Sequence, residues 1–147
     1  MNSITERAVR ILLVEDNLGD IRLTKEVFKT SKLLNQIDTV TDGEEAINYL
    51  KKNGKYENNK TPDLILLDLN LPKKDGREVL AEIKTDINLR KIPTVILTIS
   101  KAEEDIIKAY NLYANCYITK PIDLEQFNKV IKSIEEFWFT IVKLPSD

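Results

Sequence analysis

The sequence predicts a doubly wound α/β fold, in which helices cover both faces of a parallel sheet. Three short runs rich in Val, Ile and Leu, at 9–14, 64–67 and 94–97, are typical of strands buried on both faces. Amphipathic stretches separate these runs, and strand–helix alternation along a chain favours parallel strands joined by crossover helices. The chain has 147 residues, which is enough for one domain with a substantial core.

Two weaker strand candidates complete the pattern: 36–41 alternates with period two, and 116–118 is a short apolar run. Apolar residues recur at helical spacing in five stretches, at 18–28, 46–50, 79–87, 106–113 and 124–138. The sequence therefore predicts a flavodoxin-like sheet of five parallel strands, in the order 2-1-3-4-5, with five helices.

Helix starts are also readable. Thr41 with Glu44, and Ser100 with Glu103, fit the capping-box spacing, and Asp75 and Asp123 fit the N-cap position. The polar stretch 51–60 is expected to be a flexible connection. We expect one domain over 9–139, with short tails at 1–8 and 140–147.

Composition excludes several classes of function. The chain has 22 basic and 24 acidic residues, no His and one Cys, so imidazole catalysis, His-ligated zinc and CxxC redox pairs are ruled out. A net charge of −2 is weak ground for nucleic-acid binding. No apolar run is long enough to span a membrane, and the polar N-terminus does not resemble a signal peptide. We expect a cytoplasmic protein without a membrane or nucleic-acid partner.

Acidic residues follow two of the predicted strands. Glu15 and Asp16 come directly after the first strand, and Asp68 ends the third. These strands are neighbours at the switch point of a flavodoxin-like sheet, where ligands bind beside the carboxyl ends of the strands. Three carboxylates in one small space repel one another unless a cation joins them or one of them stays protonated. Mg²⁺ suits such a site because it prefers oxygen ligands.

Two further polar residues end strands on the same edge. Thr98 ends the fourth strand and Lys120 follows the fifth. Carboxylates, a metal ion, a hydroxyl and an ammonium group together suit the transfer of a phosphoryl group. Without His or an activated Cys the nucleophile is a carboxylate, and Asp68 is the most central candidate. Each residue alone has an ordinary explanation as a cap, strand or surface residue, so the prediction depends on their conjunction.

The strings LLVEDN (12–17), LILLDLNLPKKDGREVL (64–80), VILTIS (95–100) and CYITKP (116–121) make the chain resemble the receiver domain of two-component response regulators. The segment DLNLPKKDGREVLAEIK and the FWF…LP ending look most like the small single-domain regulators paired with phytochrome-type histidine kinases. The resemblance covers about residues 9–139 and implies a phosphorelay partner, a histidine kinase.

The resemblance also implies roles for individual residues. Asp68 matches the phospho-acceptor, Glu15 and Asp16 match the acidic pair that holds Mg²⁺, and the backbone carbonyl of Asn70 matches a further metal ligand. Thr98 matches the switch hydroxyl, Tyr117 matches the aromatic residue whose rotamer follows it, and Lys120 matches the phosphate-binding lysine. By this resemblance the chain is no enzyme beyond its own phosphorylation and dephosphorylation, and phosphorylation changes partner binding at the face around the fifth strand.

Three alternatives stay open. A haloacid-dehalogenase-type phosphatase also uses an Asp nucleophile and Mg²⁺, but it needs an acid two residues later, where this chain has Asn70. A flavin or nucleotide binder needs a phosphate-binding loop after the first strand, where this chain has the acidic VEDNLGD. The third alternative is a binding module that works without phosphorylation.

The C-terminal end predicts self-association. Phe137, Trp138 and Phe139 are consecutive, so on a helix they spread over about 200° of its surface. One sheet face cannot cover all three, and exposed apolar patches mark interfaces. We expect a symmetric homodimer through the C-terminal helix and tail, with the tail folding back on its own core as the alternative.

Overall fold

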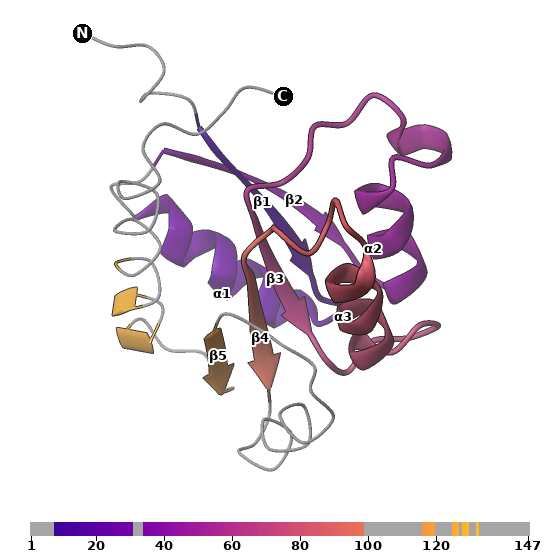
Figure 1. Cartoon of the computed structure of the whole chain (residues 1–147). Helices are drawn as coiled ribbons and strands as arrows, with labels where there is room; N and C mark the ends of the chain where they lie inside the picture. Colours follow the sequence, from indigo (N-terminus) through magenta and orange to yellow (C-terminus); the bar gives the residue numbers. More distant parts are fainter. Residues whose placement is uncertain are drawn as a thin grey trace, which may run out of the picture.

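The computed structural model describes residues 8–30, 34–98 and 116–119, together with residues 125, 126, 128, 129 and 132. Its strands form one parallel sheet, in which neighbours pair in the order β2-β1-β3-β4-β5 (Figure 1). The strands are β1 (Val9–Val14), β2 (Asn35–Val40), β3 (Leu64–Asp68), β4 (Thr94–Thr98) and β5 (Cys116–Thr119). This is the strand order of a flavodoxin-like fold, so the predicted fold class is confirmed at that level.

Three α-helices connect the strands in the described part of the chain: α1 (Leu18–Lys29), α2 (Gly43–Leu50) and α3 (Gly76–Thr85). A short 3₁₀ helix, η2 (Gly54–Tyr56), follows α2. The helix expected at 106–113 lies outside the described residues. The helix expected at 124–138 is described only at the five separate residues given above, all of them helical. The prediction of five helices therefore stays a prediction.

The core lies on both faces of the sheet, because successive side chains of a strand point to opposite faces. On one face, Ile11, Leu13, Leu64 and Leu66 pack with Phe28 and its neighbours on α1. On the other face, alternate strand residues pack with α2 and α3; they are Leu12, Val14, Ile65, Leu67 and Ile96. Figure 1 shows the helices in two layers, with α1 on one side of the sheet and α2 and α3 on the other. The continuously apolar strands are explained by this burial from both sides.

One predicted cap is confirmed and one is wrong. The Asp75 side chain accepts a hydrogen bond from the Arg77 backbone N–H at 2.7 Å, as expected for the N-cap of α3. The N-cap of α2 is Asp42 and not Thr41, because the Asp42 carboxylate accepts from the Glu45 N–H at 2.8 Å. The helix thus begins one residue later than the predicted capping box.

Two apolar residues of the predicted helix faces lie in solvent. Leu18 is 72% exposed because it occupies the first position of α1, at the edge of the sheet. Ile87 is 64% exposed because α3 ends at Thr85 and the chain then turns. Both corrections come from a helix boundary that the apolar spacing alone did not define.

The polar stretch after α2 follows a defined course. The Asn53 N–H donates to the Asn48 carbonyl at 2.9 Å, and the Lys52 N–H donates to the Tyr49 carbonyl at 3.2 Å. With Lys52 at φ 59°, these two bonds form a Schellman motif that ends the helix. The segment expected to be a flexible connection therefore contains a helix cap and η2.

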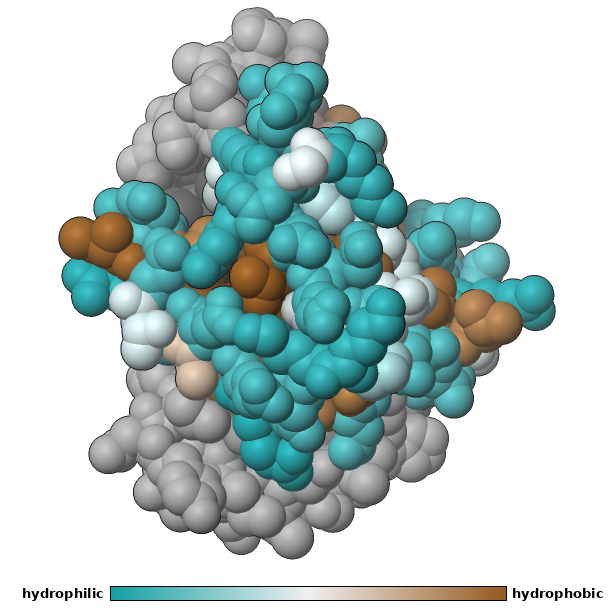
Figure 2. Space-filling model, turned by 90° about the vertical axis from the view of Figure 1, so that its right-hand side faces the viewer, coloured by the Kyte–Doolittle hydropathy of each residue, from teal (hydrophilic) through white to brown (hydrophobic). Residues whose placement is uncertain are grey.

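The side of the molecule that carries α2 and α3 is mainly hydrophilic (Figure 2). Among the described residues on this side, the hydrophobic ones form small separate spots. Within the described residues, no helix has the length and apolar character needed to cross a bilayer.

Candidate phosphorylation and metal site

Pairing of β1 with β3 brings three carboxylates together. Val14 pairs with Leu67, so the residues that follow this pair, Glu15 and Asp68, lie side by side. One carboxylate oxygen from each of Glu15, Asp16 and Asp68 lies within 4.8 Å of the others. The cluster therefore sits where the sequence predicted it, at the carboxyl ends of the two central strands.

The three acids differ in exposure. Glu15 is fully buried and Asp68 is 2% exposed, whereas Asp16 faces solvent. Backbone N–H groups hold the two buried carboxylates: Asn17 donates to Glu15 Oε2 at 3.2 Å, and Asn70 donates to Asp68 Oδ1 at 3.1 Å. The buried acids are thus oriented by the chain, and Asp16 gives the site its open side.

The N-terminus of α1 starts at the same place. The Asn17 side chain caps it by accepting from the Asp20 N–H at 2.9 Å. The positive end of the helix dipole favours negative charge nearby, so it helps to hold the acidic cluster. Sequence reasoning missed this cap, although Asn17 directly before the apolar spacing of 18–28 is an N-cap signal.

The donor set fits a hard divalent cation. All three side chains offer carboxylate oxygens, which Mg²⁺ and Mn²⁺ prefer, and their like charges favour a cation over an empty pocket. Glu15, Asp16 and Asp68 are the residues that would hold the ion. A bound divalent cation would supply positive charge that offsets the negative charge of the three carboxylates.

The other predicted site residues are placed only in part. Thr98 ends β4 one residue beyond Leu97, the partner of Asp68, so its backbone lies on the same edge. Tyr117 lies within β5, paired with Ile96. Asn70 is exposed directly after the buried Leu69. Lys120 follows the last residue of β5 and lies outside the described residues.

Gly76, the first residue of α3, is a structural requirement that sequence reasoning missed. A Cβ atom there would lie 2.4 Å from the Asp68 carbonyl oxygen and 2.5 Å from the Leu69 Cα. The Gly76 N–H also donates to the Leu69 carbonyl at 3.0 Å. Only glycine lets α3 begin against the backbone of the phospho-acceptor candidate. The signal was available, since an Asp-Gly pair starts both α2 and α3.

Comparison with known proteins agrees with this geometry. The sequence profile of the response regulator receiver domain matches residues 11–132. The chain belongs to the response regulator receiver family. It is thus a receiver domain of two-component phosphorelay signalling, as the sequence predicted.

Individual relatives cover nearly the whole chain. Response regulator Rcp1 of Synechocystis sp. (strain ATCC 27184 / PCC 6803 / Kazusa) is 52% identical over 136 residues, which is 92% of each chain. The crystal structure of the phosphorylated cyanobacterial phytochrome response regulator RcpA has a TM-score of 0.79 and 54% identity, covering 95% of this chain and 100% of that one. The Mn²⁺-bound form of Rcp1 has a TM-score of 0.77 and 51% identity, covering 94% and 99%.

Proposed function

We propose that Asp68 accepts a phosphoryl group from the phosphohistidine of a histidine kinase, with Mg²⁺ held by Glu15, Asp16, Asp68 and the Asn70 carbonyl. The observation that carries the proposal is the buried Asp68 carboxylate, within 4.8 Å of two further carboxylates at the central strands. The relatives include response regulators of phytochromes, which supports a phytochrome-type kinase as the donor.

The reaction is a displacement at phosphorus. An oxygen of the Asp68 carboxylate bonds to phosphorus as the bond to the imidazole nitrogen breaks, and the imidazole leaves neutral after taking a proton from solvent. The Asn70 N–H bond to Asp68 Oδ1 fixes one carboxylate oxygen, so the other is presented to the donor. The exposed side at Asp16 gives the donor access.

The remaining residues act after transfer. Lys120 pairs with the aspartyl phosphate, the Thr98 hydroxyl moves toward it, and Tyr117 repacks. The face formed by β5 and the helices before and after it then changes its affinity for a partner. The complete receiver has two helices in addition to α1, α2 and α3, and it works in the cytoplasm as a homodimer through its C-terminal helix and tail. The chain catalyses no reaction beyond its own phosphorylation and dephosphorylation.

The alternatives are less well supported. A phosphatase of the haloacid-dehalogenase type needs a carboxylic acid two residues after the nucleophile, and an amide stands there at Asn70. A module without phosphorylation has no use for a buried acidic cluster whose like charges oppose folding.

Phosphotransfer from purified histidine kinases, with phytochrome-type kinases in the panel, tests the proposal. We expect the label to move to the wild-type protein in Mg²⁺, and neither to Asp68→Asn nor to wild type in EDTA. Equal labelling of Asp68→Asn would refute the assignment of the acceptor. If the wild-type protein takes no label from any donor, including the small donor phosphoramidate, the proposed function fails.

A further inference from the structure

The start of α2 touches the loop that follows the phospho-acceptor. Gly43, the first residue of α2, packs against Lys74 so closely that a Cβ atom would lie 1.9 Å from the Lys74 carbonyl oxygen. The same Cβ would lie 2.7 Å from the Lys74 carbonyl carbon. Because these are backbone atoms, no change of rotamer relieves the clash. Gly43 also donates its N–H to the Pro72 carbonyl at 3.4 Å.

The loop between β3 and α3, residues 69–75, is short and closed at its base. The Gly76 N–H bonds to the Leu69 carbonyl, and Gly76 lies directly against the Asp68 backbone. The Asn70 N–H bonds to the Asp68 side chain within the same loop. The base of the loop thus ties Asn70 and Asp68 to the same short segment that contacts Gly43.

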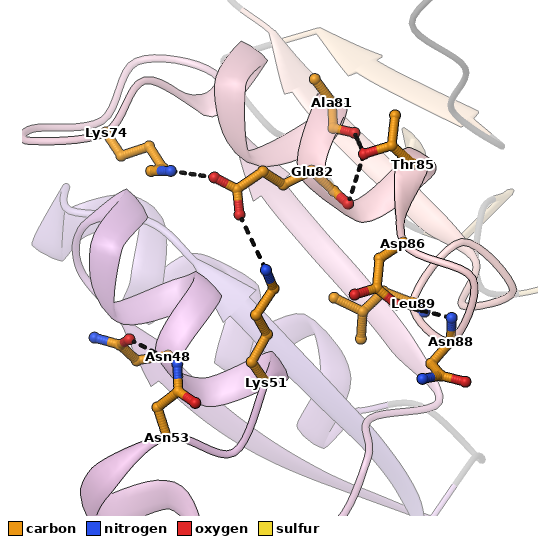
Figure 3. Close-up of polar contacts among 10 residues, drawn as sticks. All are labelled: Asn48, Lys51, Asn53, Lys74, Ala81, Glu82, Thr85, Asp86, Asn88 and Leu89. Carbon is orange, nitrogen blue, oxygen red and sulfur yellow. Dashed lines mark hydrogen bonds and ion pairs between the residues drawn. The ribbon is translucent and has the colours of Figure 1, made fainter.

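Ion pairs also connect the loop at 69–75 to α2 and α3. Lys73 pairs with Asp42, the N-cap of α2, at 3.7 Å, and Lys73 itself has a φ of 66°, which is unusual for a residue with a side chain. Figure 3 shows Lys74 from the loop and Lys51 from the C-terminal end of α2 both directed at Glu82 of α3. The Lys51 Nζ to Glu82 Oε2 distance is 3.8 Å. The loop is thus seated on α2 and α3 from several sides.

We propose that Gly43 is a positioning residue for the phosphorylation site. Because Gly43 has no Cβ, the loop that follows Asp68 and carries Asn70 can lie directly against the start of α2, and this contact fixes the position of the loop. The N-terminus of α2 is then coupled to the occupancy of the metal site. The inference rests on the proposed function, because it assigns that loop to the metal site. Coupling is reciprocal, so metal binding must also tighten the contact between Gly43 and the loop.

The test is Mg²⁺ affinity measured by calorimetry on the full chain. Outer-shell changes at metal sites cost about tenfold to a hundredfold in affinity, so we expect the Gly43→Ala variant to bind Mg²⁺ at least tenfold more weakly than wild type. The matched control is Gly54→Ala. Gly54 has a φ of 55°, and a Cβ added there would meet no atom within 4 Å, so this variant is strained without touching the loop. Its Mg²⁺ affinity stays at the wild-type value.

The outcomes separate the two proposals. If Gly43→Ala binds Mg²⁺ within twofold of wild type, or if both variants weaken binding equally, the positioning role is refuted. If wild type itself binds no Mg²⁺, the proposed function fails instead. Should Gly43→Ala not fold, hydrogen exchange of wild type decides: about tenfold slower exchange at residues 43–46 in Mg²⁺ supports the role, and unchanged exchange there overturns it.

Discussion

Replacing Asp68 by Asn removes one charge from the buried acidic cluster while nearly keeping the shape of the side chain. Glu15 and Asp68 are both buried, and their carboxylate oxygens lie within 4.8 Å, so their repulsion is about 3.5 kcal/mol at an effective dielectric constant of about 20. The Asn70 N–H can still donate to the amide oxygen of the new side chain. Hydrogen bonds to a neutral acceptor are weaker, so we expect the metal-free variant to gain about 1–3 kcal/mol of stability.

Urea unfolding of wild type and Asp68→Asn in EDTA at low salt measures this difference. Mg²⁺ offsets this difference, because a ligand present at about 100 times its Kd stabilises the state that binds it by about 2.7 kcal/mol. Wild type gains that stabilisation, and the variant, which lacks one ligand, gains less. The control is Glu57→Gln, which neutralises an exposed acid beyond η2 and should change neither value.

Two results together would refute the reasoning: Asp68→Asn is no more stable than wild type in EDTA, and Mg²⁺ stabilises both proteins equally. In that case the three carboxylates do not form a repulsive site that a cation relieves. If the variant is more stable in EDTA but gains as much stability from Mg²⁺ as wild type does, the repulsion between the carboxylates is supported. The assignment of Asp68 as a ligand of the ion is then wrong.

Three further predictions concern the framework. Lys52→Gly should raise the free energy of unfolding by up to about 1 kcal/mol, because Lys52 closes α2 at a φ of 59° that glycine adopts without strain; urea unfolding measures it, and a loss of stability contradicts the cap. Leu66→Ala, at a fully buried position of β3, should cost about 3–5 kcal/mol, whereas Leu18→Ala, at a position 72% exposed, should stay within about 0.5 kcal/mol; similar losses in the same assay would contradict the burial. Burial and the hydrogen bond to Glu45 raise the pKa of Tyr56 to about 12. The unfolded chain releases this proton near pH 10, so stability falls as pH rises from about 10 to about 12, and Tyr56→Phe should make that fall less steep; identical pH profiles would refute it.

The central sheet was predictable because burial from both faces leaves a direct mark on composition. The range 9–14 matches β1 residue for residue, and the apolar run 64–67 matches β3 up to Asp68, the polar residue expected to end that strand. β2 is half-exposed along its length, and its alternating pattern placed it one residue too late. Apolar runs thus define buried strands well, and their functional ends less well.

The acidic cluster followed from topology, because carboxyl ends of neighbouring parallel strands meet at one edge. The contacts of Gly43 and Gly76 could not be predicted in the same way. Each depends on how closely a helix start approaches a backbone segment, at Lys74 and at Asp68 respectively. The Asp-Gly pairs mark where the two helices start, but they do not say which backbone segment lies against each start. Helix ends such as Asp42 were also missed by one residue, because neighbouring Thr and Asp are both good caps.

The parallel pairing of β1 with β3 has a consequence for the newborn chain. Parallel neighbours need a crossover connection. The Asp68 carboxylate therefore joins those of Glu15 and Asp16 only after residue 68 has left the ribosome and β3 has paired with β1. A site made of all three carboxylates therefore requires β1 and β3 to be paired. A magnesium titration of nascent chains of increasing length would register the moment when the middle of the sheet closes.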